Sequence, residues 1–451
     1  MNRWSVDFHA RTPLTEQLYV QLRREIEEGV LEPGTRLPSR RRLAEMAGVS
    51  VTTAEGALGR LLEEGYALSR PKSGLYVNAV QPRPRIETAA RTEIRWNFGT
   101  GVMDASQFPY SVWAKRMREV LSEQKEELLS SGDPRGSLGL RQEIAGVLRR
   151  LRGIQADPER IVVGAGTEDL VRQVLSLVGR SGLYAVEDPG YPTIRRALVS
   201  GGARIAPLPL RDGAIDIGEL YRSGAGAVYV TPGHQFPTGT EMDAESRTAL
   251  LVWAREGNGL ILEDDYDSEF HYEEEHCPPL VAMNPERVLY LNTFARTLAP
   301  GLRIAFMLLP KGLSDRYTSL FGSCSVSCFE QETLAKMIRD GSYERHINRM
   351  RLVYKRRLTA LEKAIQETQL GTLMPCSAGL YVLLRAGGNV ASAQLCERAA
   401  QYGVRVKRLA EYGVMRTGAD MERMVLLGFA GMDEEKIQSG IEQLRQAWIE
   451  A

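Results

Sequence analysis

The densest group of reactive side chains is an acidic segment, 263–270, with the sequence EDDYDSEF. It directly follows the apolar run 260–262, which predicts a short buried strand. Carboxylates at the carboxyl end of a strand in an open α/β sheet can face a ligand in the crevice outside that end. We therefore expect Asp264 and Tyr266 to contact a ligand. For any single carboxylate, the alternative that an acidic residue simply ends the strand stays open.

Two further features suit an anionic ligand. Residues 164–168 read GAGTE between a predicted strand and a predicted helix. The backbone amides around Gly166 and the Thr167 hydroxyl can hold a phosphate there, at the positive end of the helix dipole. Arg303 adds a guanidinium fork that matches phosphate oxygens. Because the turn lacks the third glycine of a dinucleotide fingerprint, the pattern does not indicate a Rossmann site.

A third group is Arg296, within the segment TFARTLAPGLR at 293–303. A guanidinium stays protonated at physiological pH and has no free lone pair, so it cannot attack an aldehyde carbon as a lysine amine can. It can pair with a phosphate or a carboxylate. The alternative that Arg296 merely fills an abandoned cavity stays open. Lys311 follows one predicted strand later, and we do not expect it to reach the same place.

The elements that must position these groups begin after Trp96. Short continuous apolar runs alternate with long helix-like stretches, which is typical of a buried, mostly parallel sheet between helices. The runs are 161–163, 183–186, 227–230, 260–262 and 288–291. From about Arg316 the chain is helix-rich, and strand-like runs return at 380–384 and 424–427. This pattern predicts an α/β domain with a smaller C-terminal α+β subdomain.

The first 80 residues have a different pattern. Apolar residues recur at helical spacing, and Ser39 and Ser50 stand where helix N-caps are expected. The expected elements are helices over 14–29, 40–46 and 51–64 and a hairpin with its turn at 70–74. Three helices and a ribbon predict a winged helix-turn-helix. We place it at 1–80, a polar linker with alternating prolines at 81–95, and the second domain at 96–451.

Basic and hydroxyl side chains of this first domain are placed to contact DNA. Arginines at the start of the second helix can reach phosphates. Hydroxyl groups at the start of the third helix can meet base edges in a major groove, and a lysine at the wing tip can approach the backbone. The predicted DNA-binding residues are Arg40, Arg41, Arg42, Ser50, Thr52, Thr53 and Lys72. Gly56 and Gly59 each weaken the third helix by about 1 kcal/mol relative to alanine.

The composition limits the function classes. The 57 basic residues equal the 57 acidic ones, so DNA contact must come from a local patch rather than from an overall field. The five cysteines and five histidines show no metal-ligand spacing, so we expect no metal site. No apolar run reaches the length of a membrane span, and none resembles a signal peptide. We therefore expect a cytoplasmic protein with no membrane partner.

Several motifs carry a resemblance to known families. The N-terminal ones are LYVQLR at 18–23, GVLEPGTRLPS at 29–39 and EGY at 64–66, and they resemble the GntR class of bacterial transcription regulators. Val51 stands where that class commonly has an arginine. Later segments resemble fold type I aminotransferases, and the two-part layout is similar to the MocR subfamily of GntR regulators. The later segments are GDPRG at 132–136, DPGYP at 188–192, TPGHQFPTG at 231–239 and the acidic segment at 263–270.

The resemblance implies a site for pyridoxal 5'-phosphate (PLP). It places Tyr191 over the pyridine ring, Asp264 at the ring nitrogen, Tyr266 at the ring oxygen, and His234 or Gln235 beside it. It also places Arg296 where the enzymes carry the lysine that forms a Schiff base, so we expect no catalytic residue. The predicted ligand-binding residues are Gly166, Thr167, Tyr191, His234, Asp264, Tyr266, Thr293, Arg296 and Arg303.

The favoured hypothesis is a ligand-responsive transcription regulator. It would bind double-stranded operator DNA through the winged helix and sense PLP, a PLP–amino acid adduct or another small anion in a catalytically inactive pocket. PLP would bind noncovalently or as the adduct, and not as a Schiff base on Arg296. The resemblance implies a homodimer. One alternative is a PLP-dependent aminotransferase with an accessory DNA-binding domain, and another is a DNA-bound protein whose large domain only dimerises.

Overall fold

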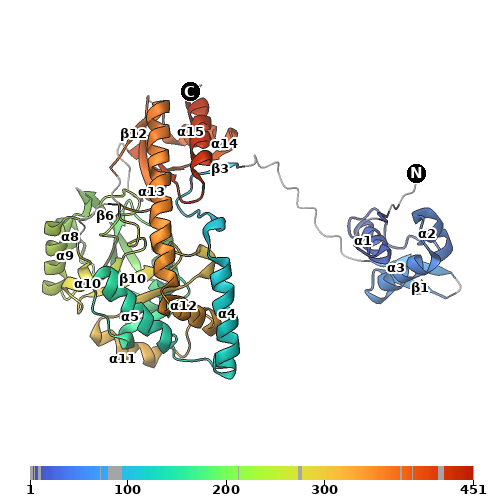
Figure 1. Cartoon of the computed structure of the whole chain (residues 1–451), viewed down its shortest axis with the longest axis horizontal. Coiled ribbons are helices and arrows are strands. Elements are labelled where there is room, and N and C mark those ends of the chain that lie inside the picture. Colours follow the sequence, from blue (N-terminus) through green and yellow to red (C-terminus); the bar gives the residue numbers. More distant parts are fainter. Residues whose placement is uncertain are drawn as a thin grey trace. The chain divides into compact units, whose positions relative to one another are not determined.

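The chain forms two compact units, Met1–Arg91 and Thr92–Ala451 (Figure 1). The computed structural model describes residues 4, 6–8, 12–71, 73–79, 94–211, 213–272, 277–375, 378–388, 390–414 and 421–449. Most of the predicted linker, 81–93, lies outside the described residues. Within the described ranges, no helix is both long enough and apolar enough to cross a membrane.

The N-terminal unit is a winged helix-turn-helix. Its elements are α1 (Leu14–Glu27), α2 (Arg40–Ala47), α3 (Val51–Glu63) and an antiparallel hairpin of β1 (Ala67–Arg70) and β2 (Gly74–Val77). The Ser39 hydroxyl accepts from the Arg42 amide at 3.4 Å, and the Ser50 hydroxyl accepts from the Thr53 amide at 3.1 Å. These bonds satisfy amides at the first turns of α2 and α3, which explains why both helices begin where they do.

The two glycines of α3 have different surroundings. A Cβ at Gly56 would lie 2.9 Å from Thr15 Cγ2, so the missing side chain lets α1 approach α3 closely. A Cβ at Gly59 would meet no atom within 4 Å. Gly56 therefore lowers the helix propensity of α3 but allows α1 to pack closely. Nothing in the described packing requires Gly59.

The second unit is built on an eight-stranded sheet with the strand order β4-β11-β10-β9-β8-β5-β6-β7. The five apolar runs of the sequence are all in this sheet, and the pairs β10–β9, β9–β8, β8–β5 and β5–β6 are parallel, as predicted. The strands are β4 (Ile161–Gly164), β5 (Leu183–Asp188), β6 (Arg204–Arg211), β7 (Ala214–Ile215), β8 (Ala227–Val230), β9 (Leu260–Asp264), β10 (Val288–Thr293) and β11 (Ala305–Leu308).

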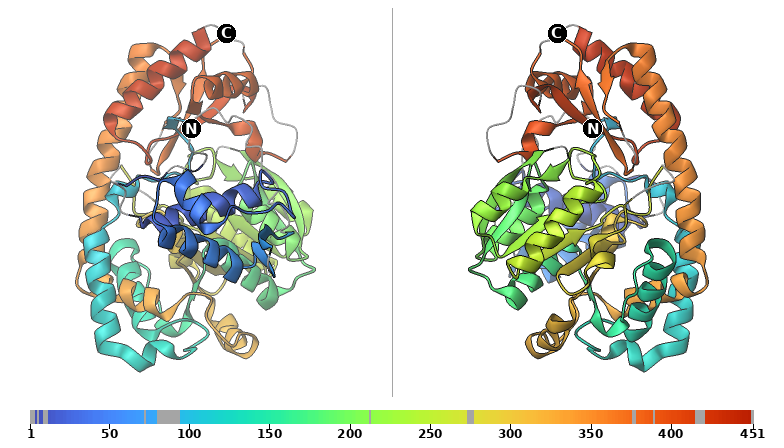
Figure 2. Two further views of the ribbon diagram at one scale, coloured as in Figure 1. Left: turned by 90° about the vertical axis from the view of Figure 1, so that its right-hand side faces the viewer. Right: turned by 90° about the vertical axis from the view of Figure 1, so that its left-hand side faces the viewer.

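Helices cover both faces of the sheet (Figure 2). Alternate strand residues face opposite sides, and each side has its own apolar core: Val163 and Ile261 belong to one, Val162 and Leu262 to the other. The first core includes residues of α5 (Leu138–Arg152), α8 (Ile217–Ser223), α9 (Ala244–Glu256), α10 (Leu280–Met283) and α12 (Cys328–Arg339). The second includes residues of α6 (Thr167–Val178), α7 (Pro192–Ser200) and α11 (Lys311–Leu320).

A smaller subdomain follows, as predicted. The long helix α13 (Ser342–Thr368) leads into it, and Figure 2 shows the orange and red subdomain at one end of the green large domain. Its sheet has the order β12-β13-β16-β15. The elements are β12 (Gly371–Leu373), β13 (Tyr381–Ala386), α14 (Ser392–Gln401), β15 (Lys407–Arg408), β16 (Met424–Gly428) and α15 (Glu434–Ile449).

The segment before α4 (Tyr110–Gln124) also joins this subdomain. β3 (Trp96–Asn97) pairs in parallel with β14 (Val404–Arg405), and the Gly428 amide donates to the Phe98 carbonyl at 2.8 Å. The chain then crosses back to the large domain. Residues 98–104 therefore lie between the two parts of this unit.

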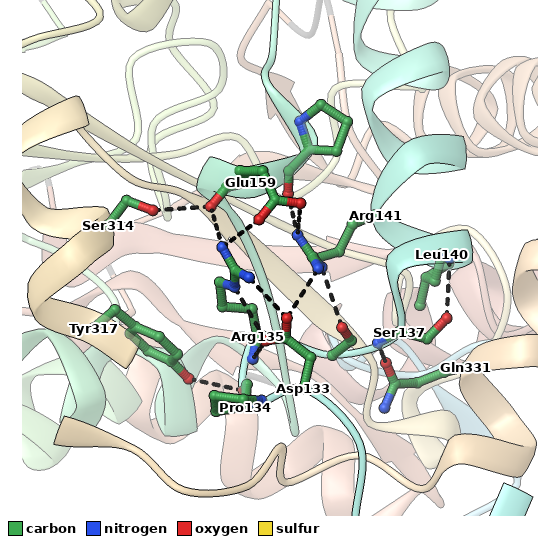
Figure 3. Close-up of polar contacts among 12 residues, drawn as sticks. Asp133, Pro134, Arg135, Ser137, Leu140, Arg141, Glu159, Ser314, Tyr317 and Gln331 are labelled. Carbon is green, nitrogen blue, oxygen red and sulfur yellow. Dashed lines mark hydrogen bonds and ion pairs between the residues drawn. The ribbon is translucent and has the colours of Figure 1, made fainter. Parts of the chain in front are cut away.

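A buried arginine network fixes the start of the large domain (Figure 3). Arg141 of α5 is only 1% exposed, and its guanidinium donates to the Pro158 carbonyl at 2.6 Å and pairs with Asp133 at 3.2 Å. Asp133 also pairs with Arg135 at 2.7 Å, and the Arg135 carbonyl accepts from the Val163 amide at 2.8 Å. This network holds β4 in place, and β4 leads into the predicted phosphate turn.

Gly59→Ala is expected to stabilise α3 by up to about 1 kcal/mol, because alanine favours the helix and its Cβ meets no other atom. Gly56→Ala should stabilise α3 less or destabilise it, since Thr15 must move. Amide hydrogen exchange of α3 in the full-length protein measures both effects. Equal protection in the two variants, or greater protection in Gly56→Ala, would contradict this account of the helix packing.

Candidate functional site

A cavity of about 190 Å³ lies at the carboxyl edge of the large sheet. The strand register explains its position: Leu291 pairs with Asp264, and Ala305 pairs with both Thr293 and Gly164, so β4, β9 and β10 end at this edge and β11 begins there. Eight of the nine predicted ligand-binding residues line the cavity. They are Gly166, Thr167, Tyr191, Asp264, Tyr266, Thr293, Arg296 and Arg303.

One end of the cavity is suited to a phosphate. Gly166 is the N-cap of α6 and has a φ of +92°, and a Cβ there would lie 2.5 Å from Arg303 Nη2. Only glycine therefore lets the backbone and the guanidinium approach so closely. Arg303 is exposed and donates to the Ala165 carbonyl at 3.0 Å. The first amides of α6, the Thr167 hydroxyl and the Arg303 guanidinium together offer donors and positive charge to an anion.

Asp264 has one paired and one unpaired oxygen. Its Oδ2 accepts from the Tyr229 hydroxyl, while its Oδ1 is buried and has no partner among the described residues. Burial raises the pKa of Asp264 to about 7, and the Tyr229 hydrogen bond and the Arg296 charge oppose that rise. A buried carboxylate oxygen without a partner is costly. A ligand nitrogen that carries a proton would satisfy it, so this acceptor fits the pyridine nitrogen of PLP.

Glu263 and Asp265 of the segment 263–270 have structural partners, whereas Glu269 has a buried oxygen without a partner among the described residues and does not line the cavity. Glu263 accepts from the Leu280 and Val281 amides at 2.7 and 2.9 Å, and so holds the start of α10. Asp265 pairs with Arg152 at 2.7 Å and accepts from the Tyr290 hydroxyl at 2.7 Å. Only Asp264 and Tyr266 of this segment line the cavity. Asp264 and Tyr266 thus fit the hypothesis of a ligand contact, whereas Glu263 and Asp265 fit the alternative of a structural role.

The ninth predicted residue, His234, does not line the cavity, which corrects the expectation that it contacts the ligand. It is 4% exposed, and the backbone of Gly379 packs against the imidazole so closely that a Cβ would lie 2.0 Å from Cε1. His234 Nδ1 lies 2.7 Å from Asp267 Oδ2 and 3.0 Å from the Tyr266 hydroxyl. His234 therefore fixes Tyr266, which does line the cavity.

Gln235, the other polar candidate of this segment, is also buried away from the cavity. Its amide nitrogen donates to Glu187 at 3.1 Å and to the Phe236 carbonyl at 2.6 Å. The residue of this segment that does line the cavity is Phe236, whose ring lies edge-on to Tyr191 with 5.3 Å between the centroids. Tyr191 and Phe236 give the cavity an aromatic wall.

Arg296 is half-buried in the cavity wall. Its Nη1 donates to the Thr100 carbonyl at 2.7 Å, and its Cζ lies 5.8 Å from the centroid of the Tyr266 ring. No lysine is among the residues that line this cavity. Lys311 begins α11, after β11, whose end at Leu308 pairs with the start of β4. Because β11 runs antiparallel to β4, Lys311 follows the opposite edge of the sheet.

Several lining residues were missed by the sequence analysis. The most informative is Tyr229, which stands in the apolar run AVYV of β8. A tyrosine in an otherwise aliphatic buried strand needs a partner for its hydroxyl, and this signal could have identified it. Thr231, which follows β8, and Thr193, in the first turn of α7, gave no such signal, because their place beside the cavity depends on the fold. Gly101 lines the cavity because the segment 98–104 passes beside it.

In the N-terminal unit, Arg41 and Arg42 are exposed on α2, and Thr52 is exposed at the start of α3. Arg40 pairs with Glu55 of α3 at 2.6 Å. Ser50 and Thr53 bond to each other through their side chains at 2.8 Å and serve as the α3 cap. Lys72 lies outside the described residues. No group of histidine, cysteine or acidic side chains within the described part of the chain is arranged to hold a metal ion.

The fold and the site together define a class of protein: a winged helix-turn-helix unit joined to a fold type I aminotransferase-like domain. Residues 14–77 match the family model of bacterial regulatory proteins, gntR family, and residues 93–444 match that of aminotransferase class I and II. The large domain resembles the crystal structure of an archaeal alanine:glyoxylate aminotransferase, with a TM-score of 0.71 and 22% identity over 79% of this chain and 91% of that one.

Known relatives share both parts. The HTH-type transcriptional regulator YdeL of Bacillus subtilis is 35% identical over 97% of each chain. The probable rhizopine catabolism regulatory protein MocR of Rhizobium meliloti is 30% identical over 98% of this chain and 95% of its own. The pyridoxine biosynthesis regulator PdxR of Corynebacterium glutamicum is 29% identical over 97% of each. The chain belongs to the MocR subfamily of GntR-type transcription regulators.

Asp264→Asn is expected to stabilise the ligand-free protein more at pH 8.5 than at pH 5. The pKa of Asp264 is raised from its ordinary value near 4 to about 7 in the fold, so the stability that the neutral carboxyl contributes is fully present only below about pH 4 and is lost as the pH rises to about 7. Asparagine keeps an acceptor for Tyr229 and carries no charge. Urea unfolding at both pH values should show a gain on the order of a few kcal/mol at the higher pH.

Asp315→Asn, an exposed change of the same kind on α11, is the matched control and should leave the pH dependence unaltered. A lower stability of Asp264→Asn than of the wild type at pH 8.5 would show that the burial of this charge does not limit stability.

Proposed function

We propose that this protein binds operator DNA through its N-terminal unit and senses PLP, or a PLP–amino acid adduct, held noncovalently in the cavity of its second unit. The observation that carries the proposal is the unpaired buried oxygen of Asp264 in a cavity that also presents a phosphate-binding turn. Such a cavity is formed for a ligand with a protonated nitrogen and an anionic group.

The residues of the cavity have distinct roles in this proposal. The start of α6 and Arg303 hold the phosphate, Tyr191 covers one face of the ring, and Asp264 takes the ring nitrogen. When bound, the cofactor supplies a phosphate, a cationic ring and a reactive substituent. In this proposal Arg296 takes the place of the lysine of the related enzymes, so the cavity recognises this ligand without a covalent bond. A carboxylate of an adduct would find its counter-charge in Arg296.

Two relatives support this choice of ligand. PdxR is named for pyridoxine biosynthesis. The LysN α-aminoadipate aminotransferase of Thermus thermophilus, solved as a complex with N-(5'-phosphopyridoxyl)-L-leucine, has a TM-score of 0.68 and 22% identity over 78% of this chain and 92% of its own. The ligand of that complex is an adduct of the cofactor with an amino acid. The likeness to the structure concerns the fold, and the residues of the present cavity carry the argument.

Arg296 also suggests how the ligand acts on the fold. Its bond to the Thr100 carbonyl joins the large domain to the segment 98–104, and Asp104 of that segment pairs with Arg357 at 2.6 Å. A ligand anion that draws the guanidinium away from Thr100 would loosen this connection. Only a ligand that binds the two arrangements unequally can shift their populations. We propose that the response is transmitted in this way, in a cytoplasmic homodimer.

The proposed DNA contacts are chosen from the side chains that are exposed on α2 and α3. Arg41 and Arg42 are exposed at the start of α2, and we propose that they bind phosphates as fixed guanidinium forks. Thr52, exposed in the first turn of α3, and Lys72 of the wing complete the proposed surface. Ser50 and Thr53 hold the start of α3 in position. The neutral overall charge of the chain makes these local cations the main source of affinity.

The ligand hypothesis predicts binding without covalent attachment. PLP should raise the melting temperature of the wild type, and borohydride should then leave no stoichiometric pyridoxyl group, because the cavity wall has no amine. Arg296→Lys should gain the mass of a reduced pyridoxyl group at residue 296 and a new absorbance band with PLP. A stoichiometric label on the wild-type chain would overturn this account, and so would the absence of any thermal shift.

Arg41→Ala should weaken binding to operator and random DNA by a similar factor and reduce the salt slope by about one. Arg24→Ala is the matched control, because Arg24 is exposed on α1 and pairs only locally with Glu28. Fluorescence anisotropy at several salt concentrations measures both variants. Equal binding by Arg41→Ala and the wild type would remove Arg41 from the proposed surface.

A further inference from the structure

The exposed face of α3 carries an unusual charge for a helix that meets DNA. Val51, Thr52 and Glu55 are exposed along its first turns, and no lysine or arginine occurs between Val51 and Gly59. The one cation of the helix, Arg60, is held on its other side. It pairs with Glu16 of α1, and its guanidinium lies 4.0 Å from the centroid of the Tyr19 ring. The charge that α3 offers to a major groove is therefore the carboxylate of Glu55.

Glu55 is held in place from α2. Arg40 Nη1 lies 2.6 Å from Glu55 Oε1, and the two side chains are 58% and 56% exposed. One turn further along α3, Gly59 leaves the space beside Glu55 open. A hollow of about 300 Å³ borders this pair, lined also by Arg36 and Ser39 and by Gly74 of the hairpin. Arg40 fixes one carboxylate oxygen and leaves the other open to an incoming group.

Stability does not explain this pair. An exposed ion pair contributes between about 0 and 1 kcal/mol, and a carboxylate on a DNA-facing helix is repelled by phosphates. Arg40 offsets that repulsion, since it neutralises Glu55 and keeps donors that can reach a phosphate. The arrangement tolerates an acid at a place where an acid alone would weaken binding. Such a residue is expected where it reads a base.

We propose that Glu55 is a specificity-determining residue that accepts a hydrogen bond from the exocyclic amine of a cytosine in the operator. An ionised carboxylate is an acceptor only, so it can pair only with donors on a base edge. The major groove offers two such donors, the cytosine N4 and adenine N6 amines. The adenine amine adjoins the N7 acceptor, which a carboxylate cannot satisfy, and the cytosine amine is the usual partner of glutamate. This inference rests on the proposed binding of operator DNA by α3. The inference goes beyond that proposal, because one base pair of the operator is recognised by the carboxylate of Glu55 rather than by an arginine.

The test is selection from a randomised duplex pool with the full-length protein, compared with Glu55→Gln. The wild type should enrich a sequence that contains a preferred C·G pair. In Glu55→Gln the preference for that pair should fall about 5- to 100-fold, while the other enriched positions stay the same. Affinity for random DNA should not fall, because a negative charge near the phosphates has been removed. Glu63→Gln, the same change at an exposed site two turns further along α3, should keep the wild-type preference.

Glu55→Arg gives a second measurement. It replaces an acceptor with a donor fork, so the preference at the same pair should turn toward guanine. An unchanged base preference in both Glu55 variants would overturn the inference about Glu55 and leave operator binding intact. Failure of the wild type to enrich any sequence would instead contradict the proposed binding of operator DNA.

Discussion

The buried carboxylate of Asp264 is the constraint on which the second unit depends. Taking an ionised group out of water is costly unless it is paired, and here pairing is only half complete. Tyr229 of β8 supplies one hydrogen bond, and the other oxygen has no partner among the described residues. Burial raises the pKa of Asp264 to about 7. The sheet register that joins β8, β9 and β10 holds this costly group at the edge of the cavity, where a ligand can satisfy it.

The other buried acids around the cavity show what a satisfied arrangement looks like. Glu187 accepts from the Thr231 amide and hydroxyl at 3.1 and 2.8 Å, and Glu263 accepts from two amides of α10. Burial nevertheless raises the pKa of each to about 7. Glu187 holds the loop that begins at Thr231, and Glu263 holds the start of α10. Asp264 differs from these two acids because the described residues supply no partner for its second oxygen.

In the proposed DNA contact, the N-terminal unit separates affinity from specificity. Arg41 and Arg42 of α2 provide positive charge that any duplex attracts, whereas the first turns of α3 present hydroxyl, aliphatic and carboxylate groups. Phosphate contacts position a protein on DNA, and base contacts select the sequence. A recognition helix without exposed cations depends on its neighbour for affinity. The pairing of Arg40 with Glu55 would join these two proposed functions at the α2–α3 contact.

Periodicity and motifs in the sequence determined both folds, since buried strands and capped amphipathic helices leave local patterns. They also identified Asp264 and Tyr266, because an acid after an apolar run is visible without a structure. The sequence could not show which of His234 and Phe236, two residues apart in one loop, lines the cavity. Tertiary packing decided that the imidazole is buried behind Tyr266 and that the phenyl ring lines the cavity. The partners of Tyr229, Arg296 and Arg40 were likewise decided by tertiary structure alone, because each lies on a different element, and only strand register and helix packing bring those elements together.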